Sequence, residues 1–272
     1  MFWTRLASGI VLVVIALCTM SLGGIPLLAV TLLISMIAYK ELTAALLCAT
    51  EGKKLNLLET LGLIGVLGYY AAIFFSDAQI WLFLCIIFMF MALMFAYVIT
   101  FPKYKASQVM GAFFAFVYAP VMLSFVYLTR ECTYGIYMVW LILISAWGCD
   151  TCAYVVGKLI GKRKIFPVLS PHKSLEGCIG GVAGAALLGG LYGTFFVEGM
   201  FPERKVALLL AFICGVGAIM SMVGDLAASA IKRNHNIKDY GKVIPGHGGI
   251  MDRFDSVIVT APMIYFLTLL LF

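Results

Sequence analysis

Residues 80–101 read IWLFLCIIFMFMALMFAYVITF and contain no charged side chain. A helix needs about 20 apolar residues to cross the ~30 Å hydrocarbon core of a bilayer, and this run is long enough. In a water-soluble domain, a helix that is apolar on every side would have no face to present to solvent. The run therefore predicts a transmembrane helix.

Apolar runs of similar length recur outward from this one, toward both ends of the chain. Of the 272 residues, 63% are hydrophobic and 12% are charged, and the mean hydropathy of +1.06 lies outside the range of soluble globular domains. The first two runs are short, and Gly23 and Gly24 between them leave a re-entrant hairpin open. We predict an all-α polytopic integral membrane protein with about nine transmembrane helices, at residues 6–22, 25–39, 61–75, 80–101, 109–128, 136–151, 177–196, 206–224 and 256–272.

Basic residues indicate which side of the membrane faces the cytoplasm, because Lys and Arg resist translocation. With this set of spans, all of the 19 Lys and Arg residues except Arg130, Arg204 and Lys205 fall on the same side as the N-terminus. The sequence thus predicts a cytoplasmic N-terminus, an outward-facing C-terminus and a multi-pass protein of the plasma membrane. Membrane orientation accounts for most of the formal net charge of +6.

The character of the chain changes near residue 145. Before this point, charged residues occupy short connections such as residues 40–59, which is typical of loops between scaffold helices. After it, two longer polar segments, residues 150–176 and 225–255, interrupt the apolar pattern on the predicted cytoplasmic side. Polar residues are costly in a membrane protein and are usually functional. We expect residues 1–144 to form an N-terminal transmembrane scaffold and residues 145–272 a catalytic region.

The predicted span at residues 177–196 is rich in glycine, including Gly177, Gly181 and Gly184. Small residues at such spacing let helix backbones approach closely. The pattern favours helix packing, either within the chain or in a homodimer, and the oligomeric state is left open. A second interpretation is that Gly177 and Gly181 let a ligand approach the backbone.

The second polar segment, residues 224–256, reads GDLAASAIKRNHNIKDYGKVIPGHGGIMDRFDS. If its first part is helical, the spacing places Asp225, Ser229, Lys232 and Arg233 on one face. Residues 245–249 must form a turn-rich loop, whose backbone amides could surround an anion. Asp252 and Asp255 then flank Arg253. Carboxylates, cations and a glycine loop at a membrane surface fit magnesium-assisted phosphoryl chemistry.

This segment resembles the signature of the phosphatidate cytidylyltransferases, also called CDP-diacylglycerol synthases. The residues that carry the resemblance are Ser229-Ala-Ile-Lys232-Arg233, Lys238-Asp239-Tyr-Gly241 and Ile244-Pro245-Gly-His247-Gly248-Gly249-Ile-Met-Asp252-Arg253-Phe-Asp255. A motif of this length is far more specific than a short glycine pattern.

The resemblance implies a role for each part of the segment. It implies that Mg²⁺ is held by Asp225 and Asp252, with Asp255 either as a third carboxylate ligand or as support for the other two, and a second cation is left open. His247 either donates to phosphate or holds the loop. The remaining implied roles are catalysis by Asp225, Asp252, Lys232, Arg233, Arg253 and His247, and substrate binding by Ser229, Lys238, Asp239, Gly246, Gly248 and Gly249.

The first polar segment begins within WGCDTCAYVVGKLIGKRKIFPVLSPHKSLEGCIGG, residues 147–181. It resembles the preceding stretch of the same family, which ends in a Ser-Pro-x-Lys-Thr/Ser-x-x-Gly pattern. Cys152 departs from the small residue expected there, and His172 occupies the variable position. Lysines and hydroxyls at a helix start suit a triphosphate. The resemblance implies that CTP contacts Asp150, Tyr154, Lys158, Lys162, Ser170, Lys173 and Ser174.

The reaction implied by the resemblance is nucleotidyl transfer at the cytoplasmic face. A phosphate oxygen of phosphatidic acid attacks the α-phosphorus of CTP, which yields CDP-diacylglycerol and pyrophosphate. The expected partners are CTP, phosphatidic acid and membrane lipids, and no nucleic acid is expected.

Other functions compete with this interpretation. A secondary transporter would carry charges at broken helices, but these charges gather at one face and no inverted repeat is visible. An enzyme with another acceptor, such as an isoprenoid phosphate or an ether-linked lipid phosphate, is a further alternative, as is a CTP-dependent lipid kinase. A CDP-alcohol phosphotransferase is disfavoured because its DGxxAR motif is absent.

Overall fold

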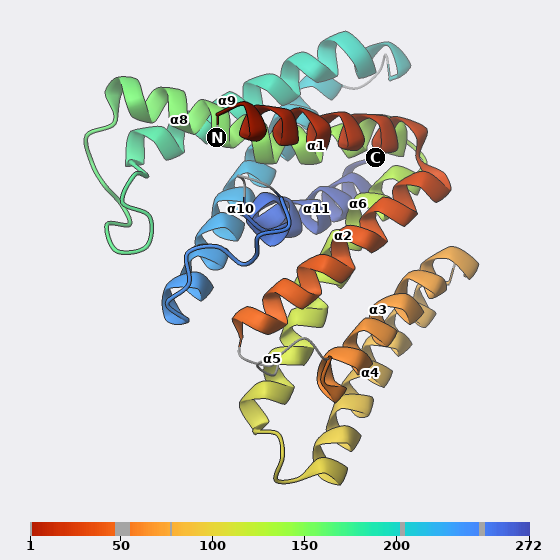
Figure 1. Ribbon diagram of the computed structural model, residues 1–272. Coiled ribbons are helices and arrows are strands. Elements are labelled where there is room, and N and C mark those ends of the chain that lie inside the picture. The colour runs from red at the N-terminus through yellow and green to blue at the C-terminus, as the bar shows by residue number, and fades with distance from the viewer. Residues whose placement is uncertain (1, 47–54, 77, 202–204, 245–247) are drawn as a thin grey trace.

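The computed structural model describes residues 2–46, 55–76, 78–201, 205–244 and 248–272, with side chains from Ser8 onward (Figure 1). Within these ranges the secondary structure is helical, apart from two isolated β-bridges. The predicted all-α class is therefore confirmed. The α-helices are α1 Phe2–Leu22, α2 Gly24–Ala45, α3 Leu57–Phe75, α4 Gln79–Thr100, α5 Ala106–Phe116, α6 Met122–Glu131, α7 Gly135–Leu143, α8 Cys149–Ile160, α9 Leu175–Tyr192, α10 Val206–Asn234 and α11 Met251–Leu271.

Short π-helical segments join several of these helices into longer units. η1 (Val117–Val121) connects α5 to α6 and contains Pro120, while η2 (Ile144–Gly148) connects α7 to α8. η3 (Gly193–Val197) and the 3₁₀ turn η4 (Glu198–Met200) extend α9. A π-helical turn changes the angular phase of the helix that follows, and such turns are frequent at functional sites. η2 directly precedes the first polar segment.

Eight of the described helical units are long and apolar enough to cross a membrane. They are Gly24–Ala45, Leu57–Phe75, Gln79–Thr100, Ala106–Glu131, Gly135–Ile160, Leu175–Met200, Val206–Asn234 and Met251–Leu271, and Ser8–Leu22 forms a shorter apolar helix. Every predicted span coincides with one of these helices, so the chain is a multi-pass membrane protein. The total of nine spans and the orientation stay predictions.

Two helices extend well beyond the spans that hydropathy predicts. α2 continues past residue 39 to Ala45, and α10 continues past residue 224 to Asn234. Hydropathy indicates where a helix leaves lipid, whereas the backbone stays helical for as long as its hydrogen bonds and packing hold. These extensions place Glu41 and Lys232 on rigid helices instead of loops.

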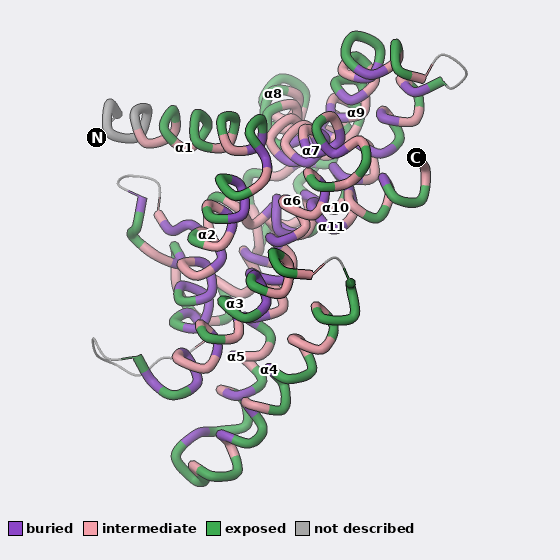
Figure 2. The backbone as a smooth tube through the Cα atoms, turned by 90° about the vertical axis from the view of Figure 1, so that its right-hand side faces the viewer, coloured by how far each residue is buried: buried purple, intermediate pink, exposed green. Residues whose placement is uncertain are grey.

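The helices pack as a chain of neighbours. α9 packs against α8 and α10, α10 against α11, and α11 against α6 and α7, while α2, α3, α4 and α5 extend the bundle on the other side (Figure 1). Burial is concentrated where α2, α6, α10 and α11 meet, and α1 and α4 present long exposed stretches (Figure 2). In an all-apolar bundle, these exposed apolar faces are the surfaces that lipid covers.

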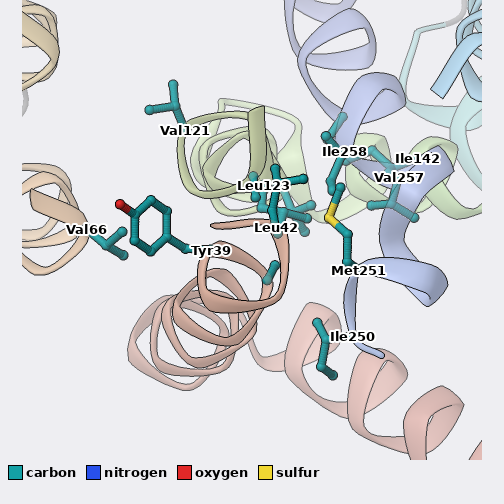
Figure 3. Packing of buried hydrophobic residues seen from close by; sticks show 14 of the residues in the cluster. Tyr39, Leu42, Val66, Val121, Leu123, Ile142, Ile250, Met251, Val257 and Ile258 are labelled. Atoms are coloured by element: carbon teal, nitrogen blue, oxygen red, sulfur yellow. The ribbon is translucent and has the colours of Figure 1, made fainter. Parts of the chain in front are cut away.

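The main core ties the start of α11 to the rest of the bundle. Met251 is fully buried, and it belongs to one cluster with Leu42 of α2, Leu123 of α6 and Ile258 of α11 (Figure 3). Close packing at this point leaves little freedom for the first turn of α11.

The glycines of α9 serve helix packing within the chain. A Cβ at Gly181 would lie 3.0 Å from the Cβ of Ala153, and one at Gly184 would lie 2.5 Å from the Sγ of Cys152. Further along, Gly189 faces Cys214 of α10 at a similarly short distance. The packing interpretation is therefore confirmed, and Cys152, which departs from the family pattern, fits because Gly184 lies opposite it.

Replacing Gly181 by leucine tests this packing. We expect Gly181→Leu to force α8 and α9 apart and to lower stability by about 1–3 kcal/mol, the usual cost of overpacking. Thermal unfolding in detergent measures the effect. Gly68→Leu on α3 is the control, because nothing lies within 4 Å of a Cβ at that position. Equal unfolding midpoints for the two variants would contradict the close contact.

Candidate active site

The loop between α8 and α9 folds back as a hairpin that presents its polar residues to the start of α9. The amide of Leu175 donates to the carbonyl of Arg163 at 2.9 Å. The carboxylate of Glu176 accepts the amides of Lys162, at 3.0 Å, and of Arg163, at 3.2 Å. Ser174 caps α9 by accepting the amide of Gly177 at 3.2 Å. The first turn of α9 thus binds the beginning of the loop through Glu176, and the end of the loop caps α9 through Ser174.

A cavity of about 420 Å³, called here the α8–α9 cavity, opens under this hairpin. It contains six of the seven residues expected to contact CTP, namely Asp150, Tyr154, Lys158, Ser170, Lys173 and Ser174. Lys162 does not line it, since its side chain is exposed and its amide is held by Glu176. Gly177 does line the cavity. The absence of a side chain at this position therefore serves both the packing of α9 against α8 and the access of a ligand to the backbone.

Two further residues of the cavity with basic side chains were not assigned from the sequence. Lys164 and His172 line it, and the Nζ of Lys164 donates to the carbonyl of His172 at 3.1 Å. Lys164 belongs to the basic cluster that includes Lys162, and only the hairpin geometry decides which of the two faces inward. His172 occupies a position where the motif tolerates variation, so no pattern would have selected it.

An ion pair joins the two polar segments. The Nζ of Lys173, at the end of the hairpin, contacts Oδ2 of Asp225 in α10. Both side chains are largely shielded from solvent, at 21% and 29% exposure, which strengthens the attraction relative to a surface pair. The pair brings the lysine of one motif to a carboxylate of the other, although some fifty residues separate them in sequence.

Three carboxylates converge beside this pair. Asp150, Asp225 and Asp255 lie close enough to interact electrostatically, and they come from α8, α10 and α11. Gly224 permits the approach, since a Cβ there would lie 2.6 Å from the carbonyl oxygen of Asp255. Asp255 also accepts the amide of Ser256 at 2.8 Å. The convergence of like charges creates a strong local preference for a cation.

Asp252 has a different environment from its neighbours. Its Oδ1 accepts the Nζ of Lys232 at 2.7 Å, and its Oδ2 accepts the amides of Tyr240 at 2.9 Å and Gly249 at 3.1 Å. Its side chain is only 3% exposed. Asp252 therefore stabilises the loop between α10 and α11 through Oδ2 and is tied to α10 through Oδ1.

Tyr240 reinforces the same loop. Its hydroxyl donates to the carbonyl of Ala228 at 2.8 Å, and its ring lies 5.4 Å from the Nζ of Lys232. Burial raises the pKa of Tyr240, so the hydroxyl remains a donor. The loop is thus tied to α10 at Tyr240 and to α11 at Asp252.

The other residues of the second segment lie around this loop. Ser229 is half-buried on α10, while Arg233, Lys238 and Asp239 are exposed. Gly248 has a φ of 89°, which favours glycine, and its carbonyl accepts the amide of Ile244 at 2.9 Å. The amide of Gly249 was expected to face an anion, and here it donates to Asp252. Gly246 and His247 lie outside the described residues.

A second cavity of about 260 Å³, called here the α1–α11 cavity, is also lined by Asp150. Asp252, Arg253 and Asp255 line it together with Asp150, and Leu12 and Trp147 supply apolar walls. Leu12, Trp147 and Phe254 also line an apolar groove that runs on between α1, α2, α6 and α11. Asp150 therefore borders both cavities, and apolar surface leads away from the second one.

The donor set suits a hard cation. Within the described residues, no group of three or more His, Cys, Asp or Glu side chains forms a ready metal cage. The carboxylates of Asp150 and Asp255 nevertheless supply oxygen atoms, Asp150 to both cavities and Asp255 to the α1–α11 cavity, and the carboxylate of Asp225 lies within electrostatic range of both. Mg²⁺ commonly takes one or two protein carboxylates and completes its shell with substrate phosphates. An open site of this kind fits Mg²⁺ better than a closed cage would.

Glu41 is the main residue that the sequence interpretation missed. It lies near the C-terminal end of α2, is 7% exposed, and its carboxylate accepts the amides of Ile250 and Met251. The available signal was a single acidic residue at the end of an apolar run, which is a functional hint in a membrane protein.

We expect Asp252→Asn to loosen the loop that Asp252 holds. An amide side chain offers one acceptor oxygen where two are used, and a hydrogen bond to a charged group contributes about 1.5–3 kcal/mol. Hydrogen exchange at the amides of Tyr240 and Gly249 should accelerate by about tenfold or more. Asp239→Asn, which alters an exposed carboxylate beside Tyr240, should leave both amides unchanged. Unchanged exchange in Asp252→Asn would count against the role described for Asp252.

Comparison with known proteins identifies the family of the chain. The model of the cytidylyltransferase family matches residues 3–271. The chain is 30% identical over 264 residues to the phosphatidate cytidylyltransferase of Staphylococcus saprophyticus, covering 96% of both chains. It is 29% identical to that of Bacillus subtilis over 97% of this chain and 96% of the relative, and 31% identical to that of Staphylococcus haemolyticus over 96% of both. The resemblance seen in the two polar segments is confirmed, and the chain belongs to the cytidylyltransferase family.

Proposed function

We propose that this protein is a phosphatidate cytidylyltransferase, which transfers CMP from CTP to phosphatidic acid and releases pyrophosphate. The observation that carries the proposal is the pair of cavities that meet at Asp150. One is lined by lysines and hydroxyls, and the other by an arginine, carboxylates and apolar residues. A soluble anionic nucleotide and an anionic lipid need two such environments side by side.

CTP occupies the α8–α9 cavity in this proposal. Lys158, Lys164 and Lys173 provide positive charge for the triphosphate, and Ser170 and Ser174 provide hydroxyls. The ring of Tyr154 is exposed, and the Nζ of Lys158 lies over it at 6.0 Å from the ring centroid. The other face of the ring is the one that stacks on the cytosine base in this proposal.

Phosphatidic acid enters from the other side. Arg253 lies on the wall of the α1–α11 cavity and offers a guanidinium to the lipid phosphate. The apolar groove beyond Leu12 and Phe254 provides a surface for acyl chains, which leave the bilayer only at a cost of ~0.8 kcal/mol per CH₂. The lipid can therefore react without leaving the membrane.

Asp225 and Asp255 would hold Mg²⁺ in this proposal, and Asp252, the third predicted ligand, would first have to release one of its hydrogen bonds with Lys232, Tyr240 and Gly249. Bound Mg²⁺ supplies positive charge at the phosphate oxygens. Asp225 forms an ion pair with Lys173, and Asp252 forms one with Lys232. Each lysine is therefore neutralised by a carboxylate until a substrate phosphate binds. When the substrates are bound, their phosphates are contacted by Lys232, Arg233 and Arg253.

The chemical step is in-line attack by a phosphate oxygen of phosphatidic acid on the α-phosphorus of CTP. The oxygen–phosphorus bond to pyrophosphate breaks as the new one forms. A phosphate monoester has its second pKa near ~6, so the nucleophile is already ionised and needs no strong base. The residues of this chain therefore act by binding, orientation and charge neutralisation.

The site faces the cytoplasm of the plasma membrane in this proposal, with residues 1–144 as scaffold. The predicted positive-inside asymmetry places both polar segments on that side, where CTP is available. A homodimer and a second cation remain proposals without a specific contact to support them.

The direct test is turnover by purified protein given CTP, Mg²⁺ and phosphatidic acid in mixed micelles. CDP-diacylglycerol and pyrophosphate should appear in equal amounts, and removing Mg²⁺ with EDTA should stop both. Asp225→Asn and Asp255→Asn should reduce turnover by about 10²–10³-fold, because electrostatic stabilisation of phosphoryl transfer is lost. Their thermal unfolding should stay close to that of the unmodified protein.

Other outcomes would redirect the proposal. Full turnover in both aspartate variants would remove the metal assignment. Turnover only with an isoprenoid phosphate or an ether-linked lipid phosphate would change the acceptor, and phosphorylated lipid without CDP-lipid would indicate a CTP-dependent kinase. Solute transport without nucleotide turnover would favour the transporter, which the family assignment and the one-sided charges already disfavour.

Lys173 should affect CTP binding. We expect Lys173→Met to raise the KM for CTP by about tenfold, the value of one charge-assisted hydrogen bond, with a smaller change in the KM for phosphatidic acid. Initial rates at varied concentrations of each substrate measure both constants. Lys103→Met, which removes an exposed lysine between α4 and α5, should leave both constants unchanged. An unaltered CTP dependence in Lys173→Met would take this residue out of the CTP site.

A further inference from the structure

Glu41 connects the scaffold helices to the catalytic loop over a very long sequence distance. Its Oε1 accepts the amide of Ile250 at 3.1 Å, and its Oε2 accepts the amide of Met251 at 2.8 Å. These amides lie 209 and 210 residues further along the chain. Glu41 is 7% exposed, so both hydrogen bonds form away from solvent.

The two amides belong to the start of α11, where a helix has N–H groups without partners. The residue at the N-cap position of α11 is Ile250, whose side chain cannot accept a hydrogen bond, and no side-chain cap is made locally. The carboxylate of Glu41 supplies the missing acceptors from another helix. Its negative charge also suits the positive end of the α11 dipole.

Two glycines enclose the carboxylate. A Cβ at Gly241 would lie 2.2 Å from Oε1 of Glu41, and a Cβ at Gly249 would lie 2.5 Å from Oε2. The loop that follows α10 therefore passes against Glu41 at both positions. This contact gives a steric reason for glycine at positions 241 and 249 that is independent of any substrate.

Glu41 and Asp252 hold the same backbone from different sides. Asp252 accepts the amides of Tyr240 and Gly249, and Glu41 accepts those of Ile250 and Met251. Three consecutive amides, at residues 249–251, are thus bound by two carboxylates. Met251 is fully buried in the core cluster that contains Leu42, next to Glu41 in sequence (Figure 3).

We propose that Glu41 is a positioning residue, which fixes the first turn of α11 so that Asp255 faces the reacting phosphates and their metal while Asp252 holds the loop that precedes α11. The role of Glu41 in the reaction rests on the proposed function, whereas its contact with the start of α11 does not. Both oxygens are required, because glutamine would keep one acceptor and direct an NH₂ group at the other amide.

The test compares Glu41→Gln with Glu59→Gln. Glu59 is a matched control, since it is 6% exposed, lies in the scaffold helix α3 and accepts a backbone amide, that of Asn56, at 3.0 Å. It caps its own helix, and the capping hydrogen bonds it makes within the described part of the chain are with Asn56, at the start of α3. Both substitutions remove one buried carboxylate of the same size and chemistry.

Four quantities are measured on full-length protein in detergent: kcat, the Mg²⁺ concentration for half-maximal rate, Mn²⁺ affinity by electron paramagnetic resonance, and hydrogen exchange at residues 249–252. We expect Glu41→Gln to lower kcat and weaken both metal dependences by about 10–100-fold, the usual effect of losing a residue that orients a metal ligand. Exchange at Ile250 and Met251 should accelerate. Glu59→Gln should lower the unfolding temperature without these changes.

The outcomes separate this inference from the proposed function. Absence of CTP-dependent turnover in the unmodified protein would defeat the proposed function, while exchange and Mn²⁺ affinity would still test Glu41. Unchanged kcat and metal affinity in Glu41→Gln, or equal losses in both variants, would overturn the positioning role. If Glu41→Gln does not fold, Gly249→Ala displaces the same carboxylate and should reproduce the weakened metal affinity.

Discussion

The convergence of three partly desolvated carboxylates, those of Asp150, Asp225 and Asp255, within electrostatic range of one another is the constraint on which the site depends. Like charges this close would separate if they shared one flexible loop. Each is instead carried by a different packed helix, and the close approach of α10 to α11 at Gly224 keeps two of them together. The packing of the bundle therefore opposes the repulsion.

The same logic explains how the surrounding polar groups are used. Lys173 pairs with Asp225 and Lys232 pairs with Asp252, while backbone amides take the remaining oxygens of Asp252. A buried polar group without a partner is costly, so Lys232 and both oxygens of Asp252 are bound by other parts of the chain. This arrangement is stable without substrate, and it still leaves the lysines able to exchange one anion for another.

A membrane enzyme with one soluble and one lipid substrate must give each a separate approach. The hairpin between α8 and α9 forms the lysine-rich cavity, and the apolar groove beside α1 continues from the second cavity. The π-helical turn η2 lies where the two meet, since Trp147 within η2 borders the second cavity and Asp150 follows shortly after it. A local irregularity in one helix thus places a single carboxylate between two chemically different spaces.

The sequence by itself determined the all-α membrane fold, because apolar runs and their length are local properties that the bilayer selects directly. It also indicated Asp225, Lys173 and Asp252, since they lie in the two polar segments, whose residues carry a recognisable chemistry. Only the tertiary structure decided that Lys164 and not Lys162 lines the cavity, that Asp252 stabilises the loop, and that Glu41 caps α11. These three results depend on which side of a hairpin faces inward and on which distant helices meet. Residues more than 200 positions apart leave no local pattern, so their pairing exists only once the helices have packed.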